Sequence, residues 1–597
     1  MRLGDIYVWT VEKGLYSSRR IRSFIEYSLD RVEQAFKSGK VVVLRAPPGI
    51  GKTAVSITLL LAILKGDFQH ASSVIHVAPT RSLIDDLAKR VRGSLAKLVG
   101  DKISTELVAR QHGLAHETYS LMAPYTITTF DTYLYSFYKL PTDEIIKIYE
   151  DGYGHYEVPR SLIFSAINFL DEVHMAIEEE TNMANAVIES IRALASSKTL
   201  TIVSTATLSN YLLNNITRLI GRSFIDLVDY GEYISQRGDD FYEIESSKVF
   251  KPLAEKPMIK VRDLCSIDEE LLERLVRELL DIAESGGRAS IVVNTVENAK
   301  CIYLRLRDRG NVIMIHSRFT PEDRIAKLNA LENNRGVLLV STQVLEVGVD
   351  MSFDAMISQI SPPSSLIQRM GRLARGEGLD EGRWAIFTSN EDLERGSGVY
   401  PPDLIDTTLD ILKPIINGKR INWHLPKSLD RSFTGYMDII DAAWSSSRWR
   451  KPSLGLQSFF EALTNPLIDS KKVYEFLKIV GGFRDENICS LYICEDQECR
   501  SLDYKELWPR SLPIPCDHML SYAEKAIGKG FAIYLLKRSG YRKHIDLEAE
   551  HIDLEVLNRL RRELNKDPLS FPIKYPSIAI PSTLYDGGVH GIGLKSL

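Results

Sequence analysis

The segment VVVLRAPPGIGKTA, residues 41–54, constrains the fold of this 597-residue chain more than any other. An apolar strand runs into a turn that contains Gly49 and Gly51, and a helical sequence starts directly after the turn. This order predicts a phosphate-binding loop, in which glycines let backbone N–H groups face phosphate oxygens at the start of a helix. Lys52 would reach the β- and γ-phosphates, and the Thr53 hydroxyl would bind Mg²⁺.

The loop departs from the strict eight-residue pattern at Ala46, where that pattern has glycine. A Gly-Lys turn that starts a helix without binding phosphate is the alternative, and the strand before the turn favours phosphate binding. The residues expected to contact the nucleotide here are Pro48, Gly49, Ile50, Gly51, Lys52, Thr53 and Ala54.

A second signal is INFLDEVHMA, residues 167–176, in which an apolar strand ends in two acids. Asp171 at a strand end suits Mg²⁺ held through water, and Glu172 suits a general base that orients the attacking water. Acidic pairs at strand ends are also common as solvated groups. The phosphate loop upstream is therefore what makes a catalytic role the favoured interpretation of this pair.

Apolar strands alternate with helical stretches through the first two thirds of the chain, which predicts α/β domains with parallel sheets. We expect strands at 40–44, 74–78, 163–170 and 200–204, and a second set at 289–294, 312–316, 337–341, 355–360 and 384–387. A polar stretch near 231–257 separates the two sets. The predicted domains are 1–235, which binds ATP, 236–420, and a mixed or mostly helical C-terminal accessory domain, 421–597.

Composition excludes some classes. The net charge is −5, with 74 Lys and Arg against 79 Asp and Glu, so coating of nucleic acid by bulk positive charge is excluded while a local basic groove is not. Six Cys do not make a disulfide framework, and a reducing, cytoplasmic setting is expected. The longest apolar run, 54–64, is too short to cross a bilayer, so no membrane partner is expected.

Further motifs follow in a fixed order: APTR at 78–81, TTFD at 128–131, STATL at 204–208, STQVLEVGVD at 341–350 and QRMGRLAR at 368–375. With these motifs the chain resembles superfamily 2 nucleic-acid helicases, which have two RecA-like domains with ATP between them. The fold that the resemblance implies is α/β, with two tandem RecA-like parallel-sheet domains.

The resemblance also assigns roles. It implies further nucleotide contacts at Gly348 and Asp350, and it makes Gln368 a residue that positions phosphate or water. Residues expected to couple hydrolysis to movement are His174, Ser204, Thr205, Ala206 and Thr207. Residues expected to hold the strand backbone are Thr80, Arg81, Thr129, Asp131, Thr342 and Gln343.

Arg372 and Arg375 lie three positions apart, so on a helix they would share one face. A guanidinium matches phosphate oxygens and keeps its charge. By resemblance Arg375 is the arginine finger and Arg372 also contacts the γ-phosphate. The alternative is a basic helix face in solvent.

Three stretches of the second half, VIMIHSRFTPEDR at 312–324, SFD at 352–354 and PPSSLIQRMGRLARGEG at 362–378, are similar to the CRISPR-associated helicases of type I interference systems. That resemblance implies an ATP-dependent helicase that moves 3′ to 5′ on single-stranded DNA, recruited by a CRISPR RNA-guided surveillance complex. The phosphate loop starts near residue 46 and no His-Asp dipeptide occurs, so we expect a stand-alone helicase subunit whose HD nuclease is a separate partner. The alternatives are a general repair or RNA helicase, and a nucleotide-gated clamp that does not unwind.

Two clusters of residues in the C-terminal domain each allow more than one interpretation. Cys489, Cys494, Cys499 and Cys516 could bind zinc, but they lack a CxxC spacing, so buried thiols or a disulfide are favoured. Aromatic and basic residues interleave at Trp444, Arg448, Trp449, Arg450 and Lys451, which could stack bases or simply pack into a core.

Overall fold

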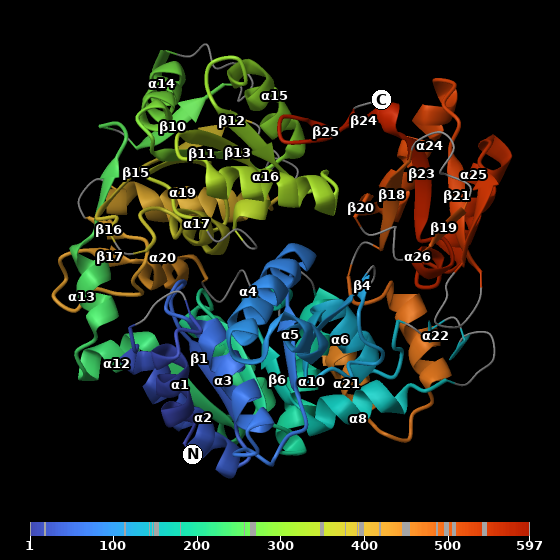
Figure 1. Cartoon of the computed structure of the whole chain (residues 1–597), viewed down its shortest axis with the longest axis horizontal. Coiled ribbons are helices and arrows are strands. Elements are labelled where there is room, and N and C mark those ends of the chain that lie inside the picture. The colour runs from blue at the N-terminus through green and yellow to red at the C-terminus, as the bar shows by residue number, and fades with distance from the viewer. Residues whose placement is uncertain are drawn as a thin grey trace.

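The computed structural model describes residues 2–16, 20–112, 115–142, 144–145, 147–148, 154–178, 181–255, 257–262, 270–346, 351–376, 378–390, 392, 399–416, 420–444, 454–484, 487–494, 501–503, 509–539 and 546–595. These residues form three parts: a first lobe, a second lobe above it in Figure 1, and a C-terminal region whose sheet lies beside both lobes.

The first lobe is built on an eight-stranded sheet in the order β4-β3-β5-β2-β6-β7-β1-β8. All its pairs are parallel except β3 with β4. The strands are β1 (Val41–Arg45), β2 (Val74–Ala78), β3 (Val108–His112), β4 (Ala115–His116), β5 (Tyr125–Thr129), β6 (Ile167–Leu170), β7 (Thr201–Thr205) and β8 (Ile225–Asp229).

Helices cover both faces of this sheet, and its central strands are buried on both sides. Along β1, Val41 and Val43 pack into one core while Val42 and Leu44 pack into the other. Successive side chains of a strand point to opposite faces, so a strand covered on both faces needs a continuous apolar run. The helices are α1 (Leu3–Glu12), α2 (Ser23–Lys37), α3 (Lys52–Leu64), α4 (Arg81–Val99), α5 (Asp101–Leu107), α6 (Phe130–Phe137), α8 (Glu157–Ser165), α9 (His174–Glu178), α10 (Thr181–Ser196), α11 (Asn210–Ile220) and α12 (Tyr230–Gln236).

The second lobe is a parallel sheet in the order β10-β15-β14-β11-β13-β12, with β9 also paired to β15. Its strands are β9 (Val249–Pro252), β10 (Met258–Val261), β11 (Arg288–Val292), β12 (Val312–Ile315), β13 (Val337–Ser341), β14 (Ala355–Gln359) and β15 (Glu381–Ser389). Its helices are α14 (Glu270–Glu284), α15 (Val296–Leu306), α16 (Pro321–Asn333), α17 (Pro363–Met370) and α19 (Pro402–Ile416). Helix α13 (Asp240–Ser247) lies in the connection between the lobes, which the sequence suggested was irregular.

The C-terminal region has two halves. The short strands β16 (Ile421–Asn422) and β17 (Thr434–Gly435) and the helices α20 (Tyr436–Ala443), α21 (Leu454–Leu463) and α22 (Ser470–Val480) pack against the lobes. A six-stranded mixed sheet follows, in the order β19-β22-β21-β23-β18-β20. Its elements are β18 (Ile488–Cys494), β19 (Ser501–Asp503), β20 (Ser511–Pro515), α24 (Cys516–Gly528), β21 (Tyr534–Ser539), β22 (Asp546–His551), α25 (Leu554–Lys566), α26 (Phe571–Lys574) and β23 (Ser577–Pro581).

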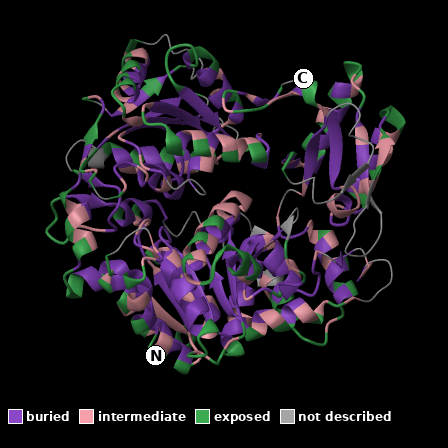
Figure 2. Ribbon diagram, in the orientation of Figure 1, coloured by how far each residue is buried: buried purple, intermediate pink, exposed green. Residues whose placement is uncertain are grey.

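The chain then forms a small hairpin, residues 585–594, from β24 (Tyr585–Asp586) and β25 (Gly593–Leu594). We call it the C-terminal hairpin. It leaves the C-terminal sheet and crosses to the second lobe beside β12 and α15 (Figure 1). Figure 2 shows that the central strands of the three large sheets are buried.

The predicted α/β class with two parallel-sheet units is confirmed, and so is most of the strand list. One strand was placed too early: residues 163–165 belong to α8, and β6 starts at Ile167. The C-terminal region is mixed, since it combines a six-stranded sheet with several helices.

The C-terminal cysteines follow the disulfide that the sequence analysis left open for them. Cys489 and Cys516 form a disulfide between β18 and the start of α24, and Cys494 is also disulfide-bonded. Thiolates that form disulfides cannot bind zinc, so the four-cysteine zinc site is wrong; Cys499 lies outside the described residues. Among the described residues, no group of His, Cys, Asp and Glu could hold a metal on its own, and no helix has the length and apolar character needed to cross a bilayer.

Candidate functional site

The predicted phosphate loop connects the end of β1 to α3, as the sequence suggested. Gly49 and Gly51 have positive φ angles of 82° and 106°, which side-chain-bearing residues rarely adopt. Lys52 begins α3 and is only 8% exposed. Its ammonium donates to the Ala46 carbonyl at 3.3 Å and to Glu172 Oε1 at 3.0 Å. The loop therefore holds one cation inside a glycine-containing turn at the start of a helix, the arrangement that binds phosphate.

Asp171 and Glu172 follow β6 and lie beside this lysine. Burial acts to raise the pKa of Asp171, but the nearby His76 and Lys52 outweigh it and lower that pKa to about 2. His76 Nε2 is 3.6 Å from Asp171 Oδ2, and its Nδ1 is 2.8 Å from the Tyr125 hydroxyl. A carboxylate that stays ionised at any physiological pH is a suitable ligand for Mg²⁺.

The second acid shows where a reacting water fits. Glu172 Oε1 is bonded to Lys52, whereas Glu172 Oε2 is buried without a hydrogen-bond partner among the described residues. A buried oxygen with free lone pairs costs free energy unless it binds a donor such as water. Together with ionised Asp171 and the Thr53 hydroxyl, this pair of acids fits a hydrated Mg²⁺ and its attacking water.

His174 connects the acids to the other lobe. Its Nε2 accepts a hydrogen bond of 2.8 Å from the Gln368 amide of the second lobe, and its Nδ1 lies 3.1 Å from the Thr205 hydroxyl. Burial lowers the pKa of His174 to about 4. The imidazole is therefore neutral near pH 7, and it can accept at one nitrogen while donating at the other.

The remaining predicted coupling residues surround this histidine. The Ser204 carbonyl accepts from Val173 N–H at 3.2 Å, which holds the motif against the strand end. The hydroxyls of Ser204 and Thr207 are buried without a hydrogen-bond partner in the described part of the chain. Ala206 is also buried.

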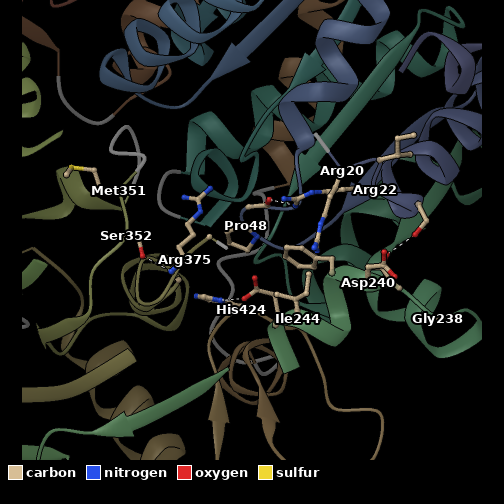
Figure 3. A pocket seen from close by; sticks show the side chains of 18 of the residues that line it. Arg20, Arg22, Pro48, Gly238, Asp240, Ile244, Met351, Ser352, Arg375 and His424 are labelled. Carbon is tan, nitrogen blue, oxygen red and sulfur yellow. Dashed lines mark hydrogen bonds and ion pairs between the residues drawn. The ribbon is translucent and has the colours of Figure 1, made fainter. Parts of the chain in front are cut away.

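The second lobe presents Arg375 to the phosphate loop. A Cβ built on Gly49 would lie 3.3 Å from Arg375 Nε, so the guanidinium stacks directly against the loop. Its backbone N–H donates to the Ser352 hydroxyl at 2.7 Å. Figure 3 shows Arg375 pointing from the second lobe toward Pro48 across the cleft.

The prediction that Arg372 and Arg375 share one helix face is wrong. Helix α17 ends at Met370, and the chain then bends through Ala374, whose φ is +46°. Arg372 donates to the Glu346 carbonyl at 2.9 Å within its own lobe. The two arginines therefore do not project from one helix, and Arg375 lies against Gly49 of the loop.

Sequence reasoning missed two arginines. Arg369 is fully buried and donates to Glu346, Ser358 and Asn294, which ties α17 to the sheet of the second lobe. Arg22 donates to the Gly49 carbonyl at 2.6 Å and lies 5.1 Å from the centre of the Phe241 ring. Nothing in the sequence around residue 22 marked it, because its partner is a main-chain oxygen.

Arg22 and Arg375 both line a cavity of about 630 Å³ at the mouth of the phosphate loop (Figure 3). Residues of the inter-lobe connection, such as Asp239 and Phe241, form another wall. The cavity opens directly from the loop, so a nucleoside attached to phosphates in the loop would enter it.

A second cavity, of about 540 Å³, lies on the other side of the inter-lobe contact. We call it the channel. Thr80, Arg81, Thr129 and Asp131 line it from the first lobe, and Gln343 lines it from the second. Thr342, the neighbour of Gln343, is buried beside it. Five of the six predicted strand-binding residues therefore line one cavity.

Two of these residues cap helices whose N-termini face the channel. The Thr80 hydroxyl accepts from Leu83 N–H at the start of α4, and the Thr129 hydroxyl accepts from Thr132 N–H at the start of α6. The third wall comes from the C-terminal region and includes Arg484, which forms a 2.7 Å ion pair with Asp131. Apart from Arg484 and Asn487, that wall is apolar and rich in proline: Ile488, Cys489, Pro513, Ile514, Pro515, Leu569, Pro572, Ile573 and Pro576.

Some predicted residues lie outside the described residues: Gly348, Asp350, Arg448, Trp449, Arg450 and Lys451. Trp444 is described, and it is buried in the large core that α20 to α22 share with the lobes.

Known proteins resemble the chain in both lobes. The DEAD/DEAH box helicase family matches residues 30–214, and the family described as CRISPR-associated nuclease/helicase Cas3, C-terminal, matches residues 285–378. The putative CRISPR-associated nuclease/helicase Cas3 of Methanocaldococcus jannaschii is 26% identical over 445 residues, which cover 68% of this chain and 54% of that protein. The CRISPR-associated helicase Cas3 of Thermoproteus tenax is 26% identical over 420 residues, covering 69% and 66% of the two chains.

The crystal structure of T. fusca Cas3-ATP matches 98% of this chain and 70% of its own, with a TM-score of 0.62 and 15% identity, a likeness of fold. The chain spans about half to two thirds of the length of the curated relatives named above.

Two parallel-sheet lobes that face each other across a phosphate loop, an acidic pair and an opposing arginine are the features expected of a superfamily 2 helicase, and residues 30–214 match the DEAD/DEAH box helicase family. Within that superfamily, the chain is most like the CRISPR-associated helicases of the Cas3 kind.

Proposed function

We propose that the chain is an ATP-dependent translocase and helicase that moves 3′ to 5′ on single-stranded DNA during CRISPR interference. The observation that carries the proposal is the Gln368–His174 hydrogen bond, which joins the lobes beside a phosphate loop that Arg375 faces. Because His174 lies next to Glu172, with Nδ1 3.4 Å from Oε2, a change at the reacting phosphate reaches the contact between the lobes.

The side chains around the phosphate loop would have separate roles in ATP hydrolysis. Lys52 would exchange Glu172 for the β- and γ-phosphates of ATP, and Glu172 would then be free to orient the attacking water. Asp171 and Thr53 would hold Mg²⁺, which neutralises phosphate charge when bound. Arg375 would stabilise the charge that develops on the transferred phosphoryl group, since a guanidinium stays charged at all working pH values.

Loss of the γ-phosphate removes the anion that attracts Arg375 to the first lobe. The lobes can then separate, and a strand held by both lobes is displaced by their relative motion. ATP would thus be the ligand that favours the closed arrangement, as population shift requires.

The channel supports a single strand as the moving substrate. Helix N-termini carry partial positive charge and free N–H groups, so the starts of α4 and α6 suit two phosphates of a backbone. Such contacts address phosphates and not base edges, so binding should be independent of sequence and should weaken with added salt.

The curated relatives carry CRISPR-associated names, which supports the same setting for this chain. We propose a CRISPR RNA-guided surveillance complex as the partner that delivers the DNA. A separate HD nuclease stays a prediction from the sequence.

ATP turnover of the purified chain with and without single-stranded DNA tests the proposal. We expect DNA to stimulate turnover and Lys52→Ala to abolish it, while substitution of the exposed Lys37 by alanine serves as the matched control. A strand-displacement assay on a 3′-tailed duplex and on a 5′-tailed duplex gives the polarity. Stronger stimulation by single-stranded RNA would favour an RNA helicase instead, and ATP turnover without displacement would favour a clamp.

A further inference from the structure

The three parts of the molecule enclose the channel. The lobes contact each other on the nucleotide side through Gln368 and His174. The C-terminal region lines the opposite side and is attached to each lobe at a separate place (Figure 1). These attachments decide whether a strand in the channel can leave sideways.

The first attachment is to the first lobe and is broad. Phe460 and Phe483 of the C-terminal region pack against the buried Tyr138. Lys139, also buried, donates to the carbonyls of Pro466 and Ile468. Apolar packing of this kind belongs to the core of the lobe, so this side of the channel is closed permanently.

The second attachment is the C-terminal hairpin, which inserts its loop into the second lobe. Asp323 of α16 accepts from the Tyr585 hydroxyl at 2.5 Å and from Gly588 N–H at 2.7 Å. Lys327, one turn later, donates to the carbonyls of Val589 and Gly591 at 2.8 and 3.0 Å.

Strand β12 and helix α15 complete the socket for the hairpin. The Tyr303 hydroxyl donates to the His590 carbonyl at 2.7 Å, and Lys300 donates to the Leu594 carbonyl. The side chain of Lys327 is fully buried under the hairpin, and burial lowers its pKa to about 8.

The hairpin is held both by hydrogen bonds to main-chain oxygens and by apolar contacts, in which Tyr585 and Ile592 pack against the core of the second lobe. A strand without an end could enter the channel only if all of these contacts broke, whereas a strand with an end could be threaded past the closed hairpin.

We propose that the C-terminal hairpin is a latch that closes the channel into a ring, so that the chain loads on single strands with a free end and excludes closed circles. The proposal rests on the proposed function, because it takes the channel as the path of the strand. It names the substrate class: a strand with an accessible end, which a nick or a break supplies.

Two glycines of the hairpin provide a matched pair of variants. Gly593 and Gly588 both have a φ of +77°. A Cβ on Gly593 would lie 2.5 Å from the Arg318 carbonyl of the second lobe, whereas a Cβ on Gly588 meets nothing within 4 Å. Gly593→Ala should push the hairpin out of its socket, and Gly588→Ala should carry the same backbone strain without that clash.

The experiment compares ATP turnover stimulated by a circular single-stranded DNA with turnover stimulated by the same circle cut once. We expect the linear form to stimulate the unaltered chain at least about tenfold more at limiting DNA, a ratio that corresponds to about 1.4 kcal/mol of latch closure. The ratio should fall to near unity for Gly593→Ala and stay unchanged for Gly588→Ala. Lys327→Met, which removes two of the latch bonds, should act like Gly593→Ala if the latter fails to fold.

The outcomes separate the two proposals. Equal stimulation of the unaltered chain by circle and linear DNA would overturn the latch and leave the helicase proposal standing. A preference for linear DNA that survives both Gly593→Ala and Lys327→Met would show that another element closes the channel, and would also overturn it. If linear DNA neither binds nor stimulates, the proposed function fails and the latch fails with it.

Discussion

The two cavities between the lobes are built in opposite ways. The nucleotide side is lined by charged groups at fixed positions: Lys52, Asp171 and Glu172 from the first lobe and Arg375 from the second. The channel is lined by helix N-termini, by separate charged groups such as Arg81, Arg324 and the Arg484–Asp131 ion pair, and by a wall rich in proline and aliphatic groups. Hydrolysis needs strong contacts with one small anion, whereas a sliding polymer needs weak contacts that each nucleotide can make in turn.

The largest effect is expected on the nucleotide side. Arg375→Ala should lower DNA-stimulated kcat by about 10³-fold, the low end of what arginine fingers contribute. Nucleotide affinity should change little, because the charge is needed mainly when phosphoryl transfer begins. Single-turnover hydrolysis and binding of a fluorescent ATP analogue separate these quantities. Arg277→Ala is the control, since Arg277 is an exposed arginine of α14 in the same lobe; an equal loss in both variants would contradict the finger role.

Lys52→Ala should come next, with a loss of about 10²-fold or more in kcat/KM, because a preorganised charge at the phosphates is removed. Here nucleotide binding should weaken as well, unlike for Arg375. Equilibrium binding of the ATP analogue checks this difference. Unchanged binding and turnover would show that the loop does not hold the phosphates.

Gln368→Ala tests the connection between the two cavities. One hydrogen bond of about 1 kcal/mol would be lost, so DNA stimulation of ATP turnover should drop about fivefold. Turnover without DNA should be affected less, because the acids and Lys52 remain in place. If both rates fall in parallel, Gln368 acts in hydrolysis itself and not in coupling.

Buried titratable groups lie on the nucleotide side, so we expect the free energy of unfolding to depend on pH through that side. The pKa of His174 is lowered by burial to about 4, against about 6.5 in the unfolded chain, with Glu172 and Asp171 opposing the shift and Lys52 adding to it. The unfolded chain binds the proton first, so stability is fully present above pH 6.5 and is lost as pH falls toward 4. Between pH 7.5 and 5 the contribution is about 2 kcal/mol.

Urea unfolding of the unaltered chain and of His174→Gln at a series of pH values measures this contribution. The difference between the two free energies of unfolding should change with pH in that window. A difference that is constant from pH 7.5 to 5 would contradict a buried neutral imidazole.

The smallest effect is expected in the channel. Arg484→Ala removes a partly exposed cation and leaves the Asp131 carboxylate facing the strand. The slope of log affinity for single-stranded DNA against log salt should fall by about 1. Fluorescence anisotropy over a salt series measures the slope. An unchanged slope would mean that Arg484 serves only to hold Asp131.

The nucleotide side was largely predictable because each of its groups sits at the end of an apolar strand. The runs VVVLR at 41–45 and INFL at 167–170 mark buried parallel strands, and parallel sheets place the ends of neighbouring strands at one edge. The shared helix face of Arg372 and Arg375 failed because α17 ends at Met370, directly before Gly371, and the chain then turns at Ala374 with a positive φ.

The channel was predictable on two walls only. The strand YTITT, residues 125–129, was not among the expected strands, and it is buried although three of its residues are threonines. The third wall combines β18, β20 and α26, which are far apart in the sequence, and the Cys489–Cys516 disulfide joins two of them. No local sequence pattern predicts such a wall, because it depends on the register of a mixed sheet.

The packing of α21 and α22 has a practical consequence for work with shortened chains. Phe460, Leu463, Val473 and Leu477 fill the same core as the helices of the first lobe. A fragment that stops at residue 420 would contain the sequences of both lobes, but it would expose this apolar surface to water. Such a fragment should aggregate or bind the missing helices when they are supplied as a separate peptide, so the smallest separable unit of this protein runs past its last helicase motif by about a hundred residues.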